Sequence, residues 1–326
     1  MLSSLTCQDF FDILKAIFVR CMLVTHALMA VWRVTVSYNN NLYWILAGIL
    51  VLLFAESCYT IIRRRGKEYQ RFMPAFLFYL STLLSCIWLL ELDKTEKYLL
   101  GQAELLDKQI NSSQDLRIPE PSLTPNTWIM LVEEMFPYLV LLSRWILPRG
   151  NVNRKELVEL LFAFIGIGGD IMEYFSLLGE EAVRPNRRLC YVVLAIWSLS
   201  VLQFTVTVTV IHQPKRQRNI NVVVDSMELV LHKKQQKFWY EVLAILLTLL
   251  MQDIPFLIVR VYIMISCNIV DYSLIFFTSK NAMIISLLIY KLLILCGSYY
   301  LSDEEDEYGE VFGQPAQKKE GQQSPP

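Results

Sequence analysis

Charged side chains interrupt the long apolar runs of this sequence at two places where their spacing suggests a shared site. The stretch GIGGDIMEY places Asp170 and Glu173 after three glycines, and the stretch QDIPFLIVR places Asp253 seven residues before Arg260. Residues three or seven apart lie on one face of a helix, so both members of each pair are expected to face the same neighbour. A charge at the centre of a bilayer costs at least about 2.5 to 3.5 kcal/mol, and such charges commonly mark ion or proton sites.

These charges are predicted to form two layers across the membrane. An outer layer contains more acids than arginines, and this imbalance implies a proton, a bound cation or a water-filled cavity. The candidate polar pocket in this outer half consists of Glu133, Asp170, Glu173, Asp253 and Arg260. An inner charge cluster, nearer the cytosol, consists of Glu56, Arg144 and Glu159.

The predicted fifth helix is expected to carry small and acidic residues on one face. The residues of this face are Glu159, Ala163, Gly166, Asp170 and Glu173. Small residues let a neighbouring helix approach closely, and carboxylates on that face must point into protein or water. We therefore expect Asp170 and Asp253 to lie on facing helices and to share a proton or a cation. The alternative is that the acids and arginines pair with one another and only fix the order of the helices.

Signatures of catalysis are lacking. The three histidines, His26, His212 and His232, are scattered, and there is no HExxH, GxSxG or phosphate-loop motif. We expect no catalytic residue, no cofactor and no metal site. The seven cysteines form no CxxC pair, which favours free, buried thiols.

The composition is that of an integral membrane protein. Of the 326 residues, 54% are hydrophobic and 19% are charged, and the mean hydropathy is +0.39. Continuous apolar runs of about 20 residues predict spanning helices rather than the alternating strands of a barrel. Eight runs qualify, at roughly 16–36, 42–62, 72–92, 127–148, 157–179, 189–211, 238–264 and 281–301. The fold class is thus all-α, a polytopic transmembrane helical bundle.

The distribution of Lys and Arg predicts cytosolic N- and C-termini, because basic loops stay on the cytosolic side. The predicted parts are a cytosolic N-terminus (1–15), a helical membrane domain (16–301) with an exterior loop (93–126) and a cytosolic loop (212–237), and a disordered acidic tail (302–326). Residues 265–280 are expected to form an interfacial or re-entrant piece, or a loop. The segment VRPNRR, 183–188, is an exception, since it places three arginines outside. Asn111 begins a glycosylation sequon in the exterior loop and predicts a glycoprotein.

Several short stretches together resemble the transmembrane protein 26 family. They are WRVT (32–35), WLLEL (88–92), SRWILP (143–148), GDIMEY (169–174), QDIPFLIVR (252–260) and KN (280–281). The resemblance covers about 16–300, and it implies a multi-pass membrane protein without an established reaction or ligand. Asp170, Glu173, Asp253 and Arg260 all fall within these stretches.

Three functions follow from these features. In the first, the outer acidic pocket binds or passes a small cation, a proton or a polar lipid headgroup. In the second, the protein is a non-transporting interaction protein whose buried charges are structural. In the third, it is a lipid scramblase. The expected surroundings are the lipid bilayer of the plasma membrane or another membrane of the secretory pathway, with no nucleic acid; nothing indicates a protein partner.

Overall fold

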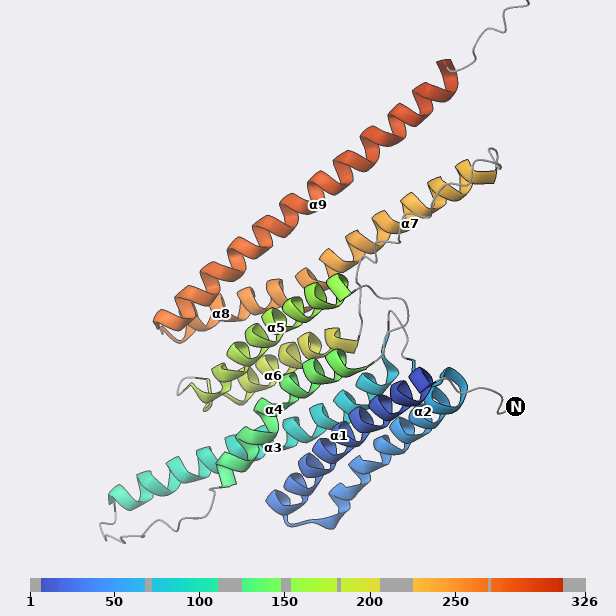
Figure 1. Cartoon of the computed structure of the whole chain (residues 1–326). Coiled ribbons are helices and arrows are strands. Elements are labelled where there is room, and N and C mark those ends of the chain that lie inside the picture. Colours follow the sequence, from blue (N-terminus) through green and yellow to red (C-terminus); the bar gives the residue numbers. More distant parts are fainter. Residues whose placement is uncertain are drawn as a thin grey trace, which may run out of the picture.

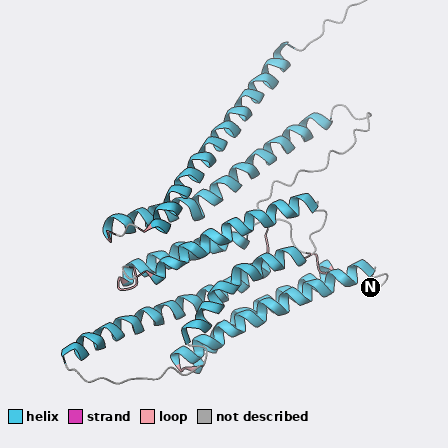
Figure 2. Ribbon diagram, turned by 60° about the vertical axis from the view of Figure 1, so that its left-hand side comes forward, coloured by secondary structure: helices cyan, strands magenta, loops and turns pink. Residues whose placement is uncertain are grey.

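The chain folds into a bundle of long helices. The computed structural model describes residues 7–67, 72–110, 125–147, 154–180, 183–205, 225–268 and 271–312, and no strand occurs among them (Figure 2). In chain order the elements are α1 (Cys7–Tyr38), η1 (Asn41–Ala47), α2 (Gly48–Arg64), α3 (Pro74–Ile110), α4 (Pro125–Ile146), α5 (Arg154–Ser176), η2 (Leu177–Gly179), α6 (Arg187–Leu202), η3 (Gln203–Thr205), α7 (Asp225–Thr248), η4 (Leu249–Asp253), α8 (Ile254–Ser266) and α9 (Tyr272–Phe312). The predicted all-α bundle is confirmed.

The helices run back and forth between the two ends of the bundle (Figure 1). One layer consists of α1, α2, α3 and α4, and α6 joins this layer to α5 and to the α7–α8 pair. The last helix, α9, packs against α7, η4 and α8, and it lies farthest from α1 and α2 (Figure 1). The beginning of α1 and the end of α9 lie at the same end of the bundle (Figure 1).

Seven described helices are long and apolar enough to cross a membrane, one fewer than predicted. They cover Asp9–Tyr38, Asn41–Arg64, Pro74–Gly101, Leu157–Gly179, Arg187–Thr205, Phe238–Ser266 and Tyr272–Tyr299. The predicted fourth span is present as α4, whose side chains are described only from Val132 onward, so it does not offer a full span to count. The chain is a multi-pass helical membrane protein.

The segment 265–280 is largely helical rather than an interfacial or re-entrant piece. The helix α8 ends at Ser266, and α9 begins at Tyr272, nine residues before the predicted start of that span. The side chain of Asp271 accepts a hydrogen bond from the backbone N–H of Ser273 at 3.1 Å, which caps the first turn of α9. This earlier start places Lys280 inside a membrane helix.

Helices also continue beyond the predicted membrane boundaries. α3 reaches Ile110 within the predicted exterior loop, α7 begins at Asp225 within the predicted cytosolic loop, and α9 runs to Phe312 within the predicted tail. Extension of an existing helix requires no new nucleus, so acidic and polar residues without proline can continue it. The remainder of the tail, 313–326, and the sequon at Asn111 lie outside the described residues.

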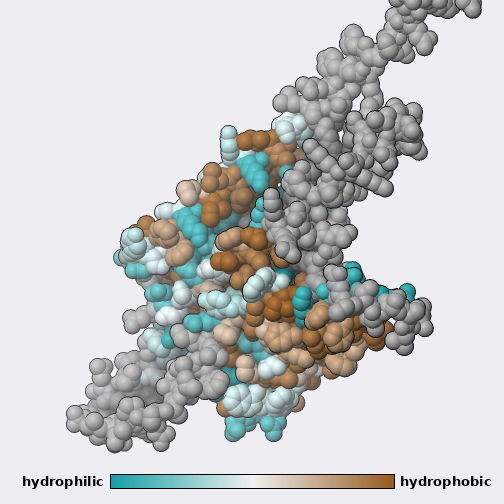
Figure 3. Space-filling model, viewed as in Figure 1, coloured by the Kyte–Doolittle hydropathy of each residue, from teal (hydrophilic) through white to brown (hydrophobic). Residues whose placement is uncertain are grey.

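Side-chain burial reflects a bundle that has lipid as its solvent. The core is built from apolar residues of α1, α3, α4, α5 and α6, including Trp197, whose ring centroid lies 5.7 Å from that of Phe136 and 4.7 Å from that of Phe175. By contrast, none of the most apolar part of α9 is buried. Broad groups of apolar side chains also cover the visible surface (Figure 3). Such a surface is stable in hydrocarbon but not in water.

Candidate functional site

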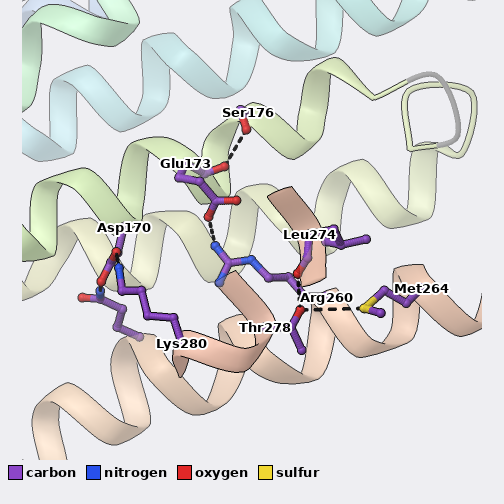
Figure 4. Close-up of polar contacts among 9 residues, drawn as sticks. Asp170, Glu173, Ser176, Arg260, Met264, Leu274, Thr278 and Lys280 are labelled. Carbon is purple, nitrogen blue, oxygen red and sulfur yellow. Dashed lines mark hydrogen bonds and ion pairs between the residues drawn. The ribbon is translucent and has the colours of Figure 1, made fainter. Parts of the chain in front are cut away.

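Two ion pairs connect α5 to the C-terminal helices. Asp170 pairs with Lys280 of α9, and Glu173 pairs with Arg260 of α8. Figure 4 shows the two acids projecting from α5 toward these basic side chains, one helical turn apart. Asp253 lies within electrostatic range of this first pair. The structure therefore brings together four of the five residues that were predicted to form the polar pocket, and it adds Lys280. The four are Asp170, Glu173, Asp253 and Arg260.

The Glu173–Arg260 pair is held by aromatic rings. Arg260 is fully buried, and its guanidinium carbon lies 5.5 to 5.7 Å from the ring centroids of Tyr174, Phe256 and Phe277. The rings of Tyr174 and Phe256 are stacked in parallel at 3.9 Å. Cation–π contacts and a planar guanidinium fix both the position and the charge of Arg260. This pair is suited to joining helices.

The Asp170–Lys280 pair has a looser environment. The side chain of Lys280 is 30% exposed, whereas that of Asp170 is 13% exposed. The lysine ammonium lies over one ring only, at 5.2 Å from the centroid of Phe277. Because lysine is a point charge on a flexible stem, it can leave a carboxylate more readily than a clamped guanidinium can.

Amide side chains extend the site from Asp170 to η3. Gln252 donates to Asp170 Oδ2 at 3.5 Å, and its own carbonyl accepts from Gln203 Nε2 at 2.5 Å. Gln203 and Gln252 are both buried. The short chain of amides fixes the direction in which Gln252 presents its N–H group to the carboxylate.

Asp253 is the unbalanced member of the site. It is only 2% exposed, its Oδ2 has no hydrogen-bond partner among the described residues, and it lies within electrostatic range of Asp170 and Lys280. On the facing helix α9, Asn281 is 1% exposed and its Nδ2 also lacks a partner there. Buried polar atoms usually have hydrogen-bond partners, so this acceptor and this donor each have unused capacity to bond a further polar species.

The helical backbone is irregular at Asp253, which is consistent with the presence of Pro255 two residues later. Residues Leu249–Asp253 form the π-helical turn η4, directly before Pro255 in the first turn of α8. Proline has no N–H and its ring clashes with the preceding turn, so a wider π turn relieves the conflict. This turn sets the positions of Gln252 and Asp253.

Glu133 is not part of this site, which corrects the predicted five-residue pocket. It is buried in α4 and accepts from Lys94 Nζ of α3 at 2.9 Å, and the same ammonium pairs with Glu91. Lys94 lay in the predicted exterior loop, but α3 continues through it as a helix. Glu133 thus belongs to a separate three-residue cluster of α3 and α4.

The predicted inner cluster is also three separate sites. Glu56 pairs with Arg20 at 3.2 Å and accepts from Thr60 Oγ1 at 2.7 Å. Arg144 donates to the backbone carbonyl of Phe204 at 2.6 Å and is fully buried, whereas Glu159 is exposed. Glu56 and Arg144 thus bind different neighbouring segments, and Glu159 lies apart from both on the exposed face of α5.

The predicted small-residue face of α5 is only half buried. Glu159, Ala163 and Gly166 are exposed, and an added Cβ at Gly166 would meet nothing within 4 Å. The glycine at a packed position is Gly168, where an added Cβ would lie 3.6 Å from Cβ of Pro137 and 4.0 Å from Cζ of Phe204. α5 packs mainly on α4 and α6, so its acids reach α8 and α9 through their side chains.

Two further expectations concern metals and cysteines. Among the described residues there is no group of three or more His, Cys, Asp and Glu side chains that could hold a metal ion. The six cysteines from Cys21 to Cys296 are all free, as predicted, but among these six only Cys86 and Cys190 are buried.

Comparison with known proteins supports the architecture. The model of the family Transmembrane protein 26 matches residues 10–291, so the chain belongs to this family. No solved structure matches the chain. The matched region contains the site around Asp170 and Asp253 and also the cluster of Glu91, Lys94 and Glu133.

Proposed function

We propose that this member of the transmembrane protein 26 family binds one proton or one small monovalent cation at Asp253 and passes it through the outer half of the membrane. The single observation that carries this proposal is a buried carboxylate oxygen that has no partner among the described residues. The charged groups within electrostatic range of Asp253 are Asp170 and Lys280.

The charge balance of the site supports a single positive species. Asp170, Glu173 and Asp253 provide three carboxylates, and Lys280 and Arg260 provide two cations. Because Glu173 and Asp170 each have a basic partner, one negative charge remains, and it falls on Asp253. Burial of an unpaired charge is costly, so a proton or a bound cation stabilises this site.

The flexible lysine provides a means of exchange. Lys280 is partly exposed and within electrostatic range of Asp253 while it pairs with Asp170. In our proposal the ammonium moves toward Asp253 when the bound species leaves, and returns to Asp170 when a new one arrives. The Glu173–Arg260 pair remains in place throughout, because its guanidinium is enclosed by three rings.

The test is ion flux in liposomes that contain the purified full-length protein. We expect proton or monovalent cation flux in the unmodified protein and none in Asp253→Asn. The matched control is Glu159→Gln, which makes the same carboxyl-to-amide change at an exposed position of α5. The control should retain flux, and all three proteins should have similar thermal stability in detergent.

A second function is favoured by the pairing of the other charges. Glu173–Arg260 and Asp170–Lys280 are matched pairs, which suits a non-transporting interaction protein with structural charges. In that case the unmodified protein would carry no proton or cation flux, and Asp253→Asn would not alter this result. Absence of flux from every variant would therefore favour the second function over the first.

A further inference from the structure

An open groove lies at the N-terminal end of α6, whereas Gln203, which bonds to Gln252 of the proposed cation site, follows the C-terminal end of α6. It has a volume of about 600 Å³ and is lined by Leu99 of α3 and by Pro185, Asn186, Arg187 and Arg188. The groove is formed where the turn after η2 enters α6. Among the residues that the structure describes, the charged side chains that line it are Arg187 and Arg188, and both are basic.

The two arginines occupy positions where positive charge is unfavourable. They are the first two residues of α6, and the N-terminus of a helix carries a partial positive charge. Asn186 caps the helix by accepting from the backbone N–H of Leu189 at 3.4 Å, so its carbonyl is already used. The predicted topology also places these arginines on the exterior side, against the positive-inside bias. Both costs are relieved when an anion binds.

A third arginine increases the positive potential beside the groove. The guanidinium carbon of Arg184 lies 5.4 Å from the ring centroid of Tyr98 of α3. This contact holds Arg184 at the turn between η2 and α6, one turn before Arg187. Three guanidinium groups within five residues, two of them lining one groove, are suited to the paired oxygens of a phosphate group.

The height of the groove in the membrane indicates the source of such a group. The apolar part of α3, Pro74–Gly101, has 28 residues. A helix of this length extends about 42 Å, whereas the hydrocarbon core of a bilayer is about 30 Å thick. Leu99 is two residues from its end, so the groove lies at the level of the lipid headgroups.

We infer that this groove, lined by Arg187 and Arg188, is a binding site for a phosphate group, carried by a lipid headgroup or free in solution. The two guanidinium groups bind the phosphate oxygens from one side. Leu99 and Pro185 provide an apolar wall on which the glycerol portion of a lipid can rest. The site is independent of Asp253, since it lies at another end of the helices and uses none of the same residues.

The inference is tested with the full-length protein in detergent and two probes, short-chain phosphatidic acid and inorganic phosphate. Binding is followed by the shift in thermal unfolding and by native mass spectrometry. Arg187→Gln/Arg188→Gln should bind the preferred probe at least about tenfold more weakly, because two charge-assisted contacts are lost. Arg187→Lys/Arg188→Lys keeps the charge but loses the paired N–H donors, and it should bind with intermediate affinity. Lys97→Gln, an exposed cation on the same part of α3, is the control and should bind normally.

The two probes separate the two sources of phosphate. Binding of phosphatidic acid alone assigns the groove to a lipid headgroup, and equal binding of inorganic phosphate assigns it to a soluble anion. Failure of both probes to bind the unmodified protein would overturn the inference. Unchanged binding in the double glutamine variant would also overturn it, and because both arginines are exposed, that variant is expected to fold.

Discussion

Arg260→Met is the substitution that best separates structural from exchangeable charges in this protein. Methionine retains much of the arginine volume and can fill the space between the aromatic rings, but it leaves Glu173 without a partner. The structure places Arg260 fully buried and Glu173 at 15% side-chain exposure. We therefore expect this change to destabilise the bundle strongly.

The expected magnitude follows from burial. Removal of one partner from a buried ion pair costs about 3 to 5 kcal/mol, because the remaining charge is left unpaired. The same change at Lys280 should cost less, about 1 to 2 kcal/mol, because that pair is intermediate between buried and exposed pairs, with lysine 30% exposed. The two variants should thus differ clearly in their free energy of unfolding.

Unfolding can be followed through the buried thiols. Cys86 and Cys190 are free and buried, so in a background in which the other cysteines are replaced by serine a thiol-reactive dye should label them only when the bundle opens. Titration with a denaturing detergent then gives the free energy of unfolding for Arg260→Met, Lys280→Met and the unmodified protein. In the double variant Glu173→Gln/Arg260→Met no unpaired charge remains, so part of the lost stability should return.

Two results would refute this reasoning. One is an Arg260→Met variant as stable as the unmodified protein. The other is a Lys280→Met variant that loses more stability than Arg260→Met. Either result would mean that α8 is not fixed to α5 through Glu173, and that the division between a rigid pair and a mobile pair is incorrect.

The remaining predictions concern other parts of the bundle. Glu133→Gln should lower the free energy of unfolding by about 1 to 3 kcal/mol, because Lys94 loses one of its two carboxylates, and the same thiol assay measures this. Gly168→Leu should cost about 1 to 3 kcal/mol through overpacking against Pro137, whereas Gly166→Leu, at an open position, should be nearly neutral. Asn111→Gln should increase gel mobility if the predicted exterior loop is glycosylated; cleavage of this loop only when protease has access to the cytosolic face would contradict the predicted topology.

The membrane architecture could be predicted because apolar runs of bilayer length have few alternative structures. The residues at which the helices begin and end could not be predicted in the same way. A hydropathy window ends where polar residues begin, but the helices α3, α7 and α9 continue through such residues. Proline and glycine, which would have ended these helices, are sparse there.

The acids of the site could be predicted, but their partners could not. Asp170, Glu173, Asp253 and Arg260 stand out because they are charges within apolar runs. Lys280 and Lys94 lie at the edges of such runs, where a lysine usually reaches water by extending its stem. Only the structure shows that their ammonium groups turn inward to Asp170 and Glu133.

The glycines of α5 illustrate a related limit. Helical periodicity predicts which residues share a face, but not which helix lies against that face. Gly168, rather than Gly166, lies against its neighbours, because α4 and η3 approach α5 from that side. Depth in the membrane likewise grouped Glu56, Arg144 and Glu159, although Glu56 pairs with α1, Arg144 bonds to η3 and Glu159 is exposed.

The most direct test of the central claim is infrared difference spectroscopy of the carboxyl groups in the reconstituted protein. We expect a band from one protonated carboxyl, or one carboxylate band that shifts when sodium or potassium is added, and we expect this signal to be absent from Asp253→Asn but present in Glu159→Gln. A spectrum that shows neither signal, or one that Asp253→Asn leaves unchanged, would contradict the assignment of Asp253 as the site of an exchangeable proton or cation.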